Sequence, residues 1–200
     1  MSAIMRTQAQ SLLMFTFMSL TFAKARAIME TKKGENVSSV RDKIIAESIS
    51  SLRREGLKFS VDTLAERLKI SKKTVYKYFP DKEALALALY EKYYGDAARL
   101  AGELMGNENS APADLLRLYF DSKTMIRSEI FNKYKLNGSI YSYAAGQNDA
   151  LWSMLSPAFS HGKSKAETET FRVIVDSSFE KLADSRLPPD AVIEMLVRLI

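Results

Sequence analysis

The sequence predicts an all-α protein, with a small N-terminal group of helices followed by a longer C-terminal helical domain. Apolar residues recur at spacings of three and four along most of the chain, and the alternating pattern of strands is scarce. Serine, aspartate, proline and glycine residues separate the periodic segments. The chain is 46% hydrophobic and 26% charged, which is typical of a globular protein.

The first helix is expected over residues 40–55, with Ser38 or Ser39 as its cap and Gly56 as its stop. Its apolar residues are spaced to form one buried face. They are Ile44, Ile45, Ile49 and Leu52.

Two short helices and a long one follow. Ser60 is the expected cap of the second helix, whose inner face is Val61, Leu64, Ala65 and Leu68. Ser71 caps the third helix, residues 72–79, and Pro80 ends it because the residue before a proline is pushed out of helical geometry. Asp81 caps a fourth helix that is expected to extend to Met105.

The break "GNENSAP" separates this group from the rest of the chain. Further helices are expected at roughly 112–128, 129–145, 147–157, 165–183 and 189–200. The stretches "SHGKSK" and "DSRLPPD" are expected to be loops. The last helix is expected to reach Ile200 with no capping residue. We therefore expect that the natural chain continues beyond Ile200 or that this sequence is clipped there.

The opening run "QSLLMFTFMSLTFAKARA", residues 10–27, permits two interpretations. With the base Arg6 before it and A-x-A patterns at its end, residues 1–27 resemble a signal peptide, which would make this an exported helical protein. Alternatively, residues 1–38 are an N-terminal extension and polar linker, with a natural start at Met29. The run is shorter than the ~20 apolar residues of a membrane span, so no membrane association is expected.

The composition disfavours an enzyme. The chain has one histidine and no cysteine, and no glycine-rich phosphate loop is present. We therefore expect no catalytic residue, no metal site and no cofactor. The absence of cysteine is compatible with the reducing cytoplasm.

The positive charge is concentrated in one segment. Residues 41–82 carry 11 Lys and Arg against 6 Asp and Glu, which equals the net charge of +5 of the whole chain. A local basic surplus favours polyanions such as DNA. Two short helices joined by a tight turn, the second of them basic, also predict a helix-turn-helix motif.

In this motif the second helix enters the major groove of DNA. Val75 and Phe79 are four residues apart and are expected to anchor its inner face. The other residues are left to be presented outward, where lysines and tyrosine hydroxyls suit phosphate oxygens and Lys73 and Thr74 suit base edges.

The segment "VDTLAERLKISKKTVYKYFPDKEAL", residues 61–85, closely resembles the DNA-binding domain of TetR-type transcriptional regulators. The resemblance covers about residues 40–94 and implies a DNA-binding domain over 39–94. It implies that lysines and Thr74 face the groove, that tyrosines contact the backbone and that Lys82 contacts a phosphate. The full expected set is Ser71, Lys72, Lys73, Thr74, Tyr76, Lys77, Tyr78 and Lys82. The implied core is Ile45, Ile49, Leu52, Leu57, Phe59, Leu64, Leu68, Ile70, Val75, Phe79 and Leu85.

Two features depart from the family pattern. Lys69 stands in the turn where the family usually has glycine, and a positive φ there would cost a lysine about 1 kcal/mol. The loop "GLKFS" before the second helix is a residue tighter than common forms.

By the same resemblance, residues 95–200 would be a regulatory and dimerisation domain that binds a small-molecule inducer. The implied function is a cytoplasmic homodimeric repressor of a palindromic operator on double-stranded DNA. Tyr119, Tyr143 and Trp152 are candidate ligand contacts, although aromatic residues at helical spacing also suit an ordinary core. The expected dimer stripes are Phe171, Ile174, Phe179 and Leu182, then Val192, Ile193, Leu196 and Leu199.

Overall fold

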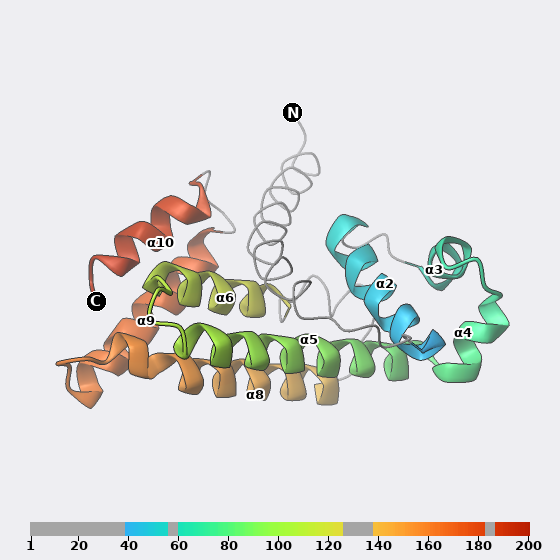
Figure 1. Cartoon of the computed structure of the whole chain (residues 1–200), viewed down its shortest axis with the longest axis horizontal. Coiled ribbons are helices and arrows are strands. Elements are labelled where there is room, and N and C mark those ends of the chain that lie inside the picture. The colour runs from blue at the N-terminus through green and yellow to red at the C-terminus, as the bar shows by residue number, and fades with distance from the viewer. Residues whose placement is uncertain (1–38, 56–59, 126–137, 183–186) are drawn as a thin grey trace.

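The computed structural model describes residues 39–55, 60–125, 138–182 and 187–200, and all regular elements within these ranges are helices (Figure 1). They are α2 (Val40–Glu55), α3 (Val61–Arg67), α4 (Lys72–Tyr78), α5 (Lys82–Met105), α6 (Pro112–Thr124), α8 (Gly138–Leu155), the 3-10 turn η2 (Ser156–Phe159), α9 (Lys165–Leu182) and α10 (Pro189–Val197). The all-α class is confirmed. The opening run at residues 10–27 lies outside the described residues, as do Leu57 and Phe59.

The N-terminal helices begin where the sequence predicts, because local capping fixes their starts. The side chains of Ser60, Ser71 and Asp81 each accept a hydrogen bond from the amide three residues on, at 3.1, 3.0 and 2.7 Å. Ser39 and Asp42 cap α2 reciprocally: the Asp42 amide donates to Ser39 Oγ at 3.2 Å and the Ser39 amide to Asp42 Oδ2 at 3.3 Å.

Predicted boundaries are wrong at the last helix, where α10 ends at Val197 and not at Ile200, and within α8. We expected a break between residues 145 and 147, but α8 runs unbroken through Gly146 and is followed directly by η2. A glycine inside a helix costs only about 1 kcal/mol, and packing on either side of Gly146, by buried Ala144 and Asn148, outweighs that cost. The part of the predicted 129–145 helix before residue 138, and the predicted end of the 112–128 helix, lie outside the described residues.

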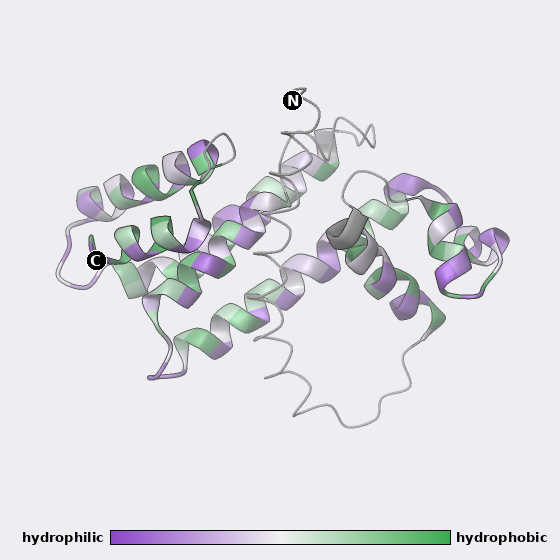
Figure 2. Cartoon of the chain, turned by 90° about the horizontal axis from the view of Figure 1, so that it is seen from above, coloured by the Kyte–Doolittle hydropathy of each residue, from purple (hydrophilic) through white to green (hydrophobic). Residues whose placement is uncertain are grey.

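The helices are amphipathic, and both hydrophilic and hydrophobic residues occur along them (Figure 2). The apolar faces of α2, α3, α4 and the start of α5 form an N-terminal core, in which Ile49, Leu68 and Ile70 are partly buried. Its buried members are Ile44, Ile45, Val61, Leu64, Ala65, Val75, Phe79, Leu85 and Ala88. The expected core residues for which burial is described therefore all pack here.

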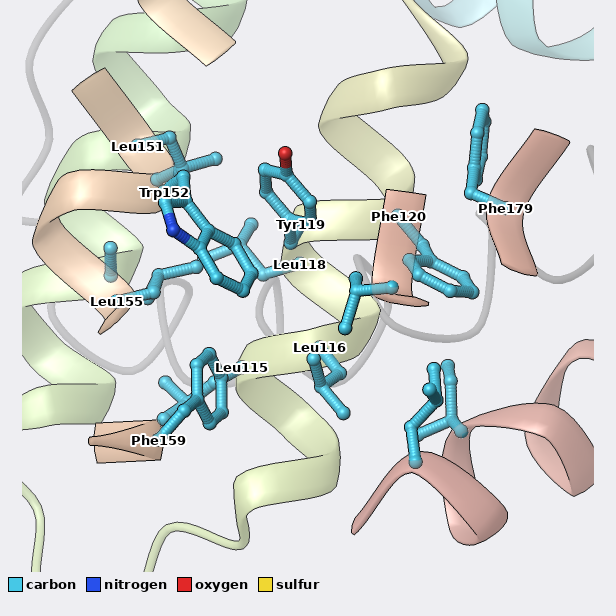
Figure 3. Packing of buried hydrophobic residues seen from close by; sticks show 14 of the residues in the cluster. Leu115, Leu116, Leu118, Tyr119, Phe120, Leu151, Trp152, Leu155, Phe159 and Phe179 are labelled. Carbon is cyan, nitrogen blue, oxygen red and sulfur yellow. The ribbon is translucent and has the colours of Figure 1, made fainter. Parts of the chain in front are cut away.

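A second, larger core joins the end of α5 with α6, α8, η2, α9 and α10. Figure 3 shows its centre, where Tyr119 of α6 lies against Trp152 of α8 with ring centroids 4.8 Å apart. The tilted rings of Phe159 of η2 and Phe171 of α9 also lie against Trp152, with centroid distances of 5.7 and 6.3 Å. These aromatic contacts fasten four elements to one another.

Helix α5 connects the two ends of the molecule, packing against α2, α6 and α8 (Figure 1). Residues in the middle of α5 pack with residues after α6 and in α8 to form a third cluster. Its buried members are Leu89, Tyr90, Tyr93, Tyr94, Met125, Ile140 and Ala144. Two of its hydroxyls satisfy carbonyls at the end of α6: Tyr90 donates to Met125 O at 2.7 Å and Tyr94 to Ser122 O at 3.1 Å. Burial raises the pKa of Tyr94, so this donor keeps its proton.

Lys69, in the turn between α3 and α4, has φ 52°, so the positive φ considered from the sequence is present. The replacement Lys69→Gly is expected to raise the free energy of unfolding by about 1 kcal/mol, because glycine has no Cβ to strain in this conformation. Urea unfolding measures the change. Lys69→Ala is the matched control: it removes the charge but retains the Cβ, and an equal gain from it would contradict the strain argument.

Candidate nucleic-acid interface

Helix α4 is held by two side chains and presents the others. Val75 is 1% exposed and Phe79 is 3% exposed, both inside the N-terminal core. The Arg41 guanidinium lies 5.3 Å from the centroid of the Phe79 ring and connects the start of α2 to this anchor. The other side chains of α4 are therefore not needed to anchor the helix to this core.

The predicted contact residues lie almost entirely on the exposed surface. Thr74 is half-buried, and the exposed members are Ser71, Lys72, Lys73, Tyr76, Lys77, Tyr78 and Lys82. The Ser71 and Thr74 hydroxyls hydrogen-bond one another at 2.8 Å, in addition to the cap that Ser71 makes to the Thr74 amide. Both hydroxyls thus help to fix the start of α4.

The lysines of α4 differ in their partners. Lys72 Nζ lies 2.8 Å from Asp62 Oδ1 on α3, and the hydrogen bond to that carboxylate raises the pKa of Lys72. Within the described ranges, no carboxylate lies within salt-bridge distance of Lys73 or Lys77. These two ammonium groups are available to an incoming anion as they stand.

Lys82 is exposed in the first turn of α5, beside the cap made by Asp81. The Asp81 carboxylate already accepts the Ala84 amide at 2.7 Å. The negative charge of this carboxylate offsets part of the positive charge at the start of the helix. A phosphate would therefore be attracted here mainly by the ammonium group of Lys82.

Sequence reasoning missed two polar contacts that shape this surface. Arg67 Nη1 donates to Ser51 Oγ at 2.9 Å and fastens α3 to α2. Asp62 pairs with Lys72, ten positions later, on the next helix. Neither pair follows a helical spacing rule, and only Asp62 and Lys72 gave a sequence signal, as opposite charges on adjacent predicted helices.

The three ligand candidates do not lie together. Tyr119 and Trp152 are in contact inside the C-terminal core (Figure 3), whereas half-buried Tyr143 packs on the cluster in the middle of α5. Tyr119 and Trp152 are buried in that core, and their contact with a ligand stays a prediction.

A partly buried polar network adjoins Tyr119. Its hydroxyl donates to Asp176 Oδ1 at 2.9 Å, and Lys123 Nζ lies 2.8 Å from the same oxygen. The Asn148 side-chain amide donates to the Tyr119 hydroxyl at 3.5 Å. Burial, and then the charge of Asp176, raise the pKa of Tyr119. The sequence singled out Tyr119 but not Asp176 or Lys123, which become neighbours only through the packing of α6 on α9.

Most residues of the predicted dimer stripes pack against other helices of the same chain. Phe171, Phe179, Leu182, Ile193 and Leu196 are all buried in the C-terminal core, so these residues were wrongly expected on an outer face. Two members of the predicted stripes, Ile174 and Leu199, are exposed, as are the nearby apolar side chains of Val173 and Met195.

Two kinds of feature are absent from the described residues. No group of three or more His, Cys, Asp or Glu residues there is arranged to hold a metal ion. In the same ranges, no helix combines the length and apolar character needed to cross a membrane.

Comparisons with known proteins agree with this geometry. Residues 44–89 match the family model described as bacterial regulatory proteins, tetR family. An uncharacterized HTH-type transcriptional regulator of Bacillus subtilis (strain 168), YvaF, is 28% identical over 67 residues. That match covers 34% of this chain and 35% of the relative, so it spans about a third of the relative's length.

The fold resembles a TetR transcriptional regulator from Legionella pneumophila, with a TM-score of 0.58 and 16% identity over 83% of this chain and 100% of that one. A TetR-family regulator from Bordetella parapertussis 12822 gives a TM-score of 0.49 and 18% identity, over 80% of this chain and 93% of that one. The family match includes the capped, outward-facing helix α4. Residues 44–89 therefore match the tetR family of bacterial regulatory proteins, and the fold of the chain is similar to that of a TetR transcriptional regulator.

Proposed function

We propose that this chain is a cytoplasmic homodimeric repressor that binds a palindromic operator and leaves it when a small-molecule inducer binds. The observation that carries the DNA-binding part is α4, a helix with two buried anchors and an outer surface of lysines and tyrosines. In this proposal residues 39–94 bind DNA, and residues 95–200 bind the inducer and dimerise. Residues 1–38 are an extension.

The contacts divide by chemistry. Lys72, Lys73, Thr74 and Lys77 face the major groove, where Lys73 and Thr74 can reach base edges. Lys72, the first residue of α4, binds a phosphate at the edge of the groove. Tyr76, Tyr78 and Lys82 contact phosphates and fix the register of the helix on the duplex, with Ser71 at its start.

Selection from random duplexes with the full chain tests this proposal. A homodimer is expected to select an inverted repeat whose half-sites are about 10 base pairs, or a multiple, apart. Sedimentation equilibrium on the same sample is expected to give twice the chain mass. A single asymmetric site bound by a monomer would contradict the dimer. Failure of the selection to enrich any sequence would contradict operator binding.

Alanine variants separate affinity from sequence preference. Lys72→Ala and Tyr76→Ala are expected to weaken binding to all duplexes, because phosphates are the same in every sequence. Lys72→Ala is also expected to reduce the slope of log K against log salt by about 0.9. Lys73 and Thr74 variants are expected to change the selected sequence.

Gel shifts at several salt concentrations measure these effects. Lys181→Ala is the control, because it removes an exposed lysine from α9, far along the chain from α4. Wild-type affinity in Tyr76→Ala would overturn the phosphate assignment.

We place the inducer beside Tyr119 and Trp152, where the network of Asp176, Lys123 and Asn148 offers polar groups within an apolar core. Tyr143 would contact only a ligand that extends toward the middle of α5. Trp152 is the one tryptophan of the chain, so its fluorescence reports on this region alone. A compound that releases DNA without changing this fluorescence would contradict the location.

A further inference from the structure

An ion pair on the proposed DNA-binding surface holds a lysine before DNA arrives. Asp62 lies in the first turn of α3 and Lys72 is the first residue of α4, and their charged atoms are 2.8 Å apart. Both side chains are largely exposed. We propose that Asp62 is an intramolecular competitor for Lys72, which lowers the affinity of this surface for DNA. The inference rests on the proposed DNA-binding function.

The competition follows from electrostatics. A phosphate that binds Lys72 must either displace the Asp62 carboxylate or share the ammonium with it. Displacement gives up the existing charge-assisted hydrogen bond, and sharing places two anions close together. Because the pair is exposed, its loss weakens binding by no more than about fivefold. Each route therefore weakens binding to every sequence, because phosphates are common to all.

Asp62 contributes little else to the stability of the fold. The cap of α3 is Ser60, whose hydroxyl accepts the Thr63 amide at 3.1 Å. Asp62 adds a modest favourable interaction with the positive end of the helix. The replacement Asp62→Asn keeps the size and polarity of the side chain and removes only its charge.

The experiment uses the full chain and two duplexes of equal length, the selected operator and a mixed-sequence duplex. Asp62→Asn is expected to bind both more tightly than the wild type, by up to about fivefold, with a steeper salt dependence. Glu66→Gln is the matched control. It removes the same charge from an exposed position one turn later on α3 and should have a clearly smaller effect.

A double-mutant cycle identifies Lys72 as the point of action. In a Lys72→Ala background, Asp62→Asn is expected to change affinity no more than Glu66→Gln does. If the full gain persists without Lys72, Asp62 acts only as a general negative charge and the inference is wrong.

Two other results would also overturn the inference. Weaker binding by Asp62→Asn would mean that the carboxylate positions Lys72 for DNA. Unchanged affinity would mean that the pair does not compete. Circular dichroism confirms that each variant is folded. If the wild type binds neither duplex, the proposed function itself fails, which is distinguishable from all these outcomes.

Discussion

Phe79→Ala is expected to lower the free energy of unfolding by about 3–5 kcal/mol and to abolish DNA binding. The ring is 3% exposed in the N-terminal core and also lies beneath the Arg41 guanidinium. Its removal leaves a cavity at the end of α4, so the helix loses one of its two anchors. Urea unfolding measures the stability, and fluorescence anisotropy with a labelled operator measures the binding.

The adjacent residue provides the control. Tyr78 is 40% exposed, so Tyr78→Ala is expected to change stability by less than about 0.5 kcal/mol while still weakening DNA binding. The two variants together separate the anchor of α4 from its presented surface. Comparable destabilisation by both would show that the two faces of α4 are wrongly assigned.

Asp176→Asn is expected to destabilise the protein by about 2–3 kcal/mol. Asparagine can still accept the hydrogen bond from Tyr119, but it leaves the ammonium of Lys123 without the opposite charge that now lies 2.8 Å away. The side chain of Lys123 is only 11% exposed, whereas that of Asp176 is 31% exposed, which places the effect below that of a fully buried pair. Chemical denaturation measures the loss.

Asp149→Asn is the matched control for this effect. Asp149 pairs with Arg172 but has a 65% exposed side chain, so its loss should cost less than about 1 kcal/mol. Adding Lys123→Met to Asp176→Asn is expected to restore part of the stability, because no unpaired charge then remains buried. If Asp149→Asn and Asp176→Asn are equally destabilising, burial does not control the energy of these pairs.

The sequence predicted those features that depend on near neighbours in the chain. The caps Ser60, Ser71 and Asp81 act over three residues, so their identity alone located the starts of α3, α4 and α5. The buried face of α4 followed from the spacing of Val75 and Phe79. The strain at Lys69 was also accessible, because the turn and the residue type together raise the question of φ.

Features that depend on packing were not accessible in this way. Gly146 suggested a break, but tertiary contacts keep α8 continuous through it. The apolar stripe of α9 was correctly seen, yet periodicity does not say whether a stripe packs within the chain or against a partner, and Phe171 packs within it. The pairings of Asp62 and Asp176 need the crossing of two helices before the partners can be named.

The continuity of α5 has a consequence for protein engineering. Domains are most easily exchanged between related proteins at the flexible linker that usually joins them. Between the two cores of this chain lies a single 24-residue helix instead. Leu85 packs in one core and Leu100 in the other, while Tyr90 and Tyr94 bond the end of α6. The junction of a functional chimera must therefore lie within a helix and keep its register. The hydroxyl donors on that helix must also match the carbonyl acceptors at the end of the helix that replaces α6.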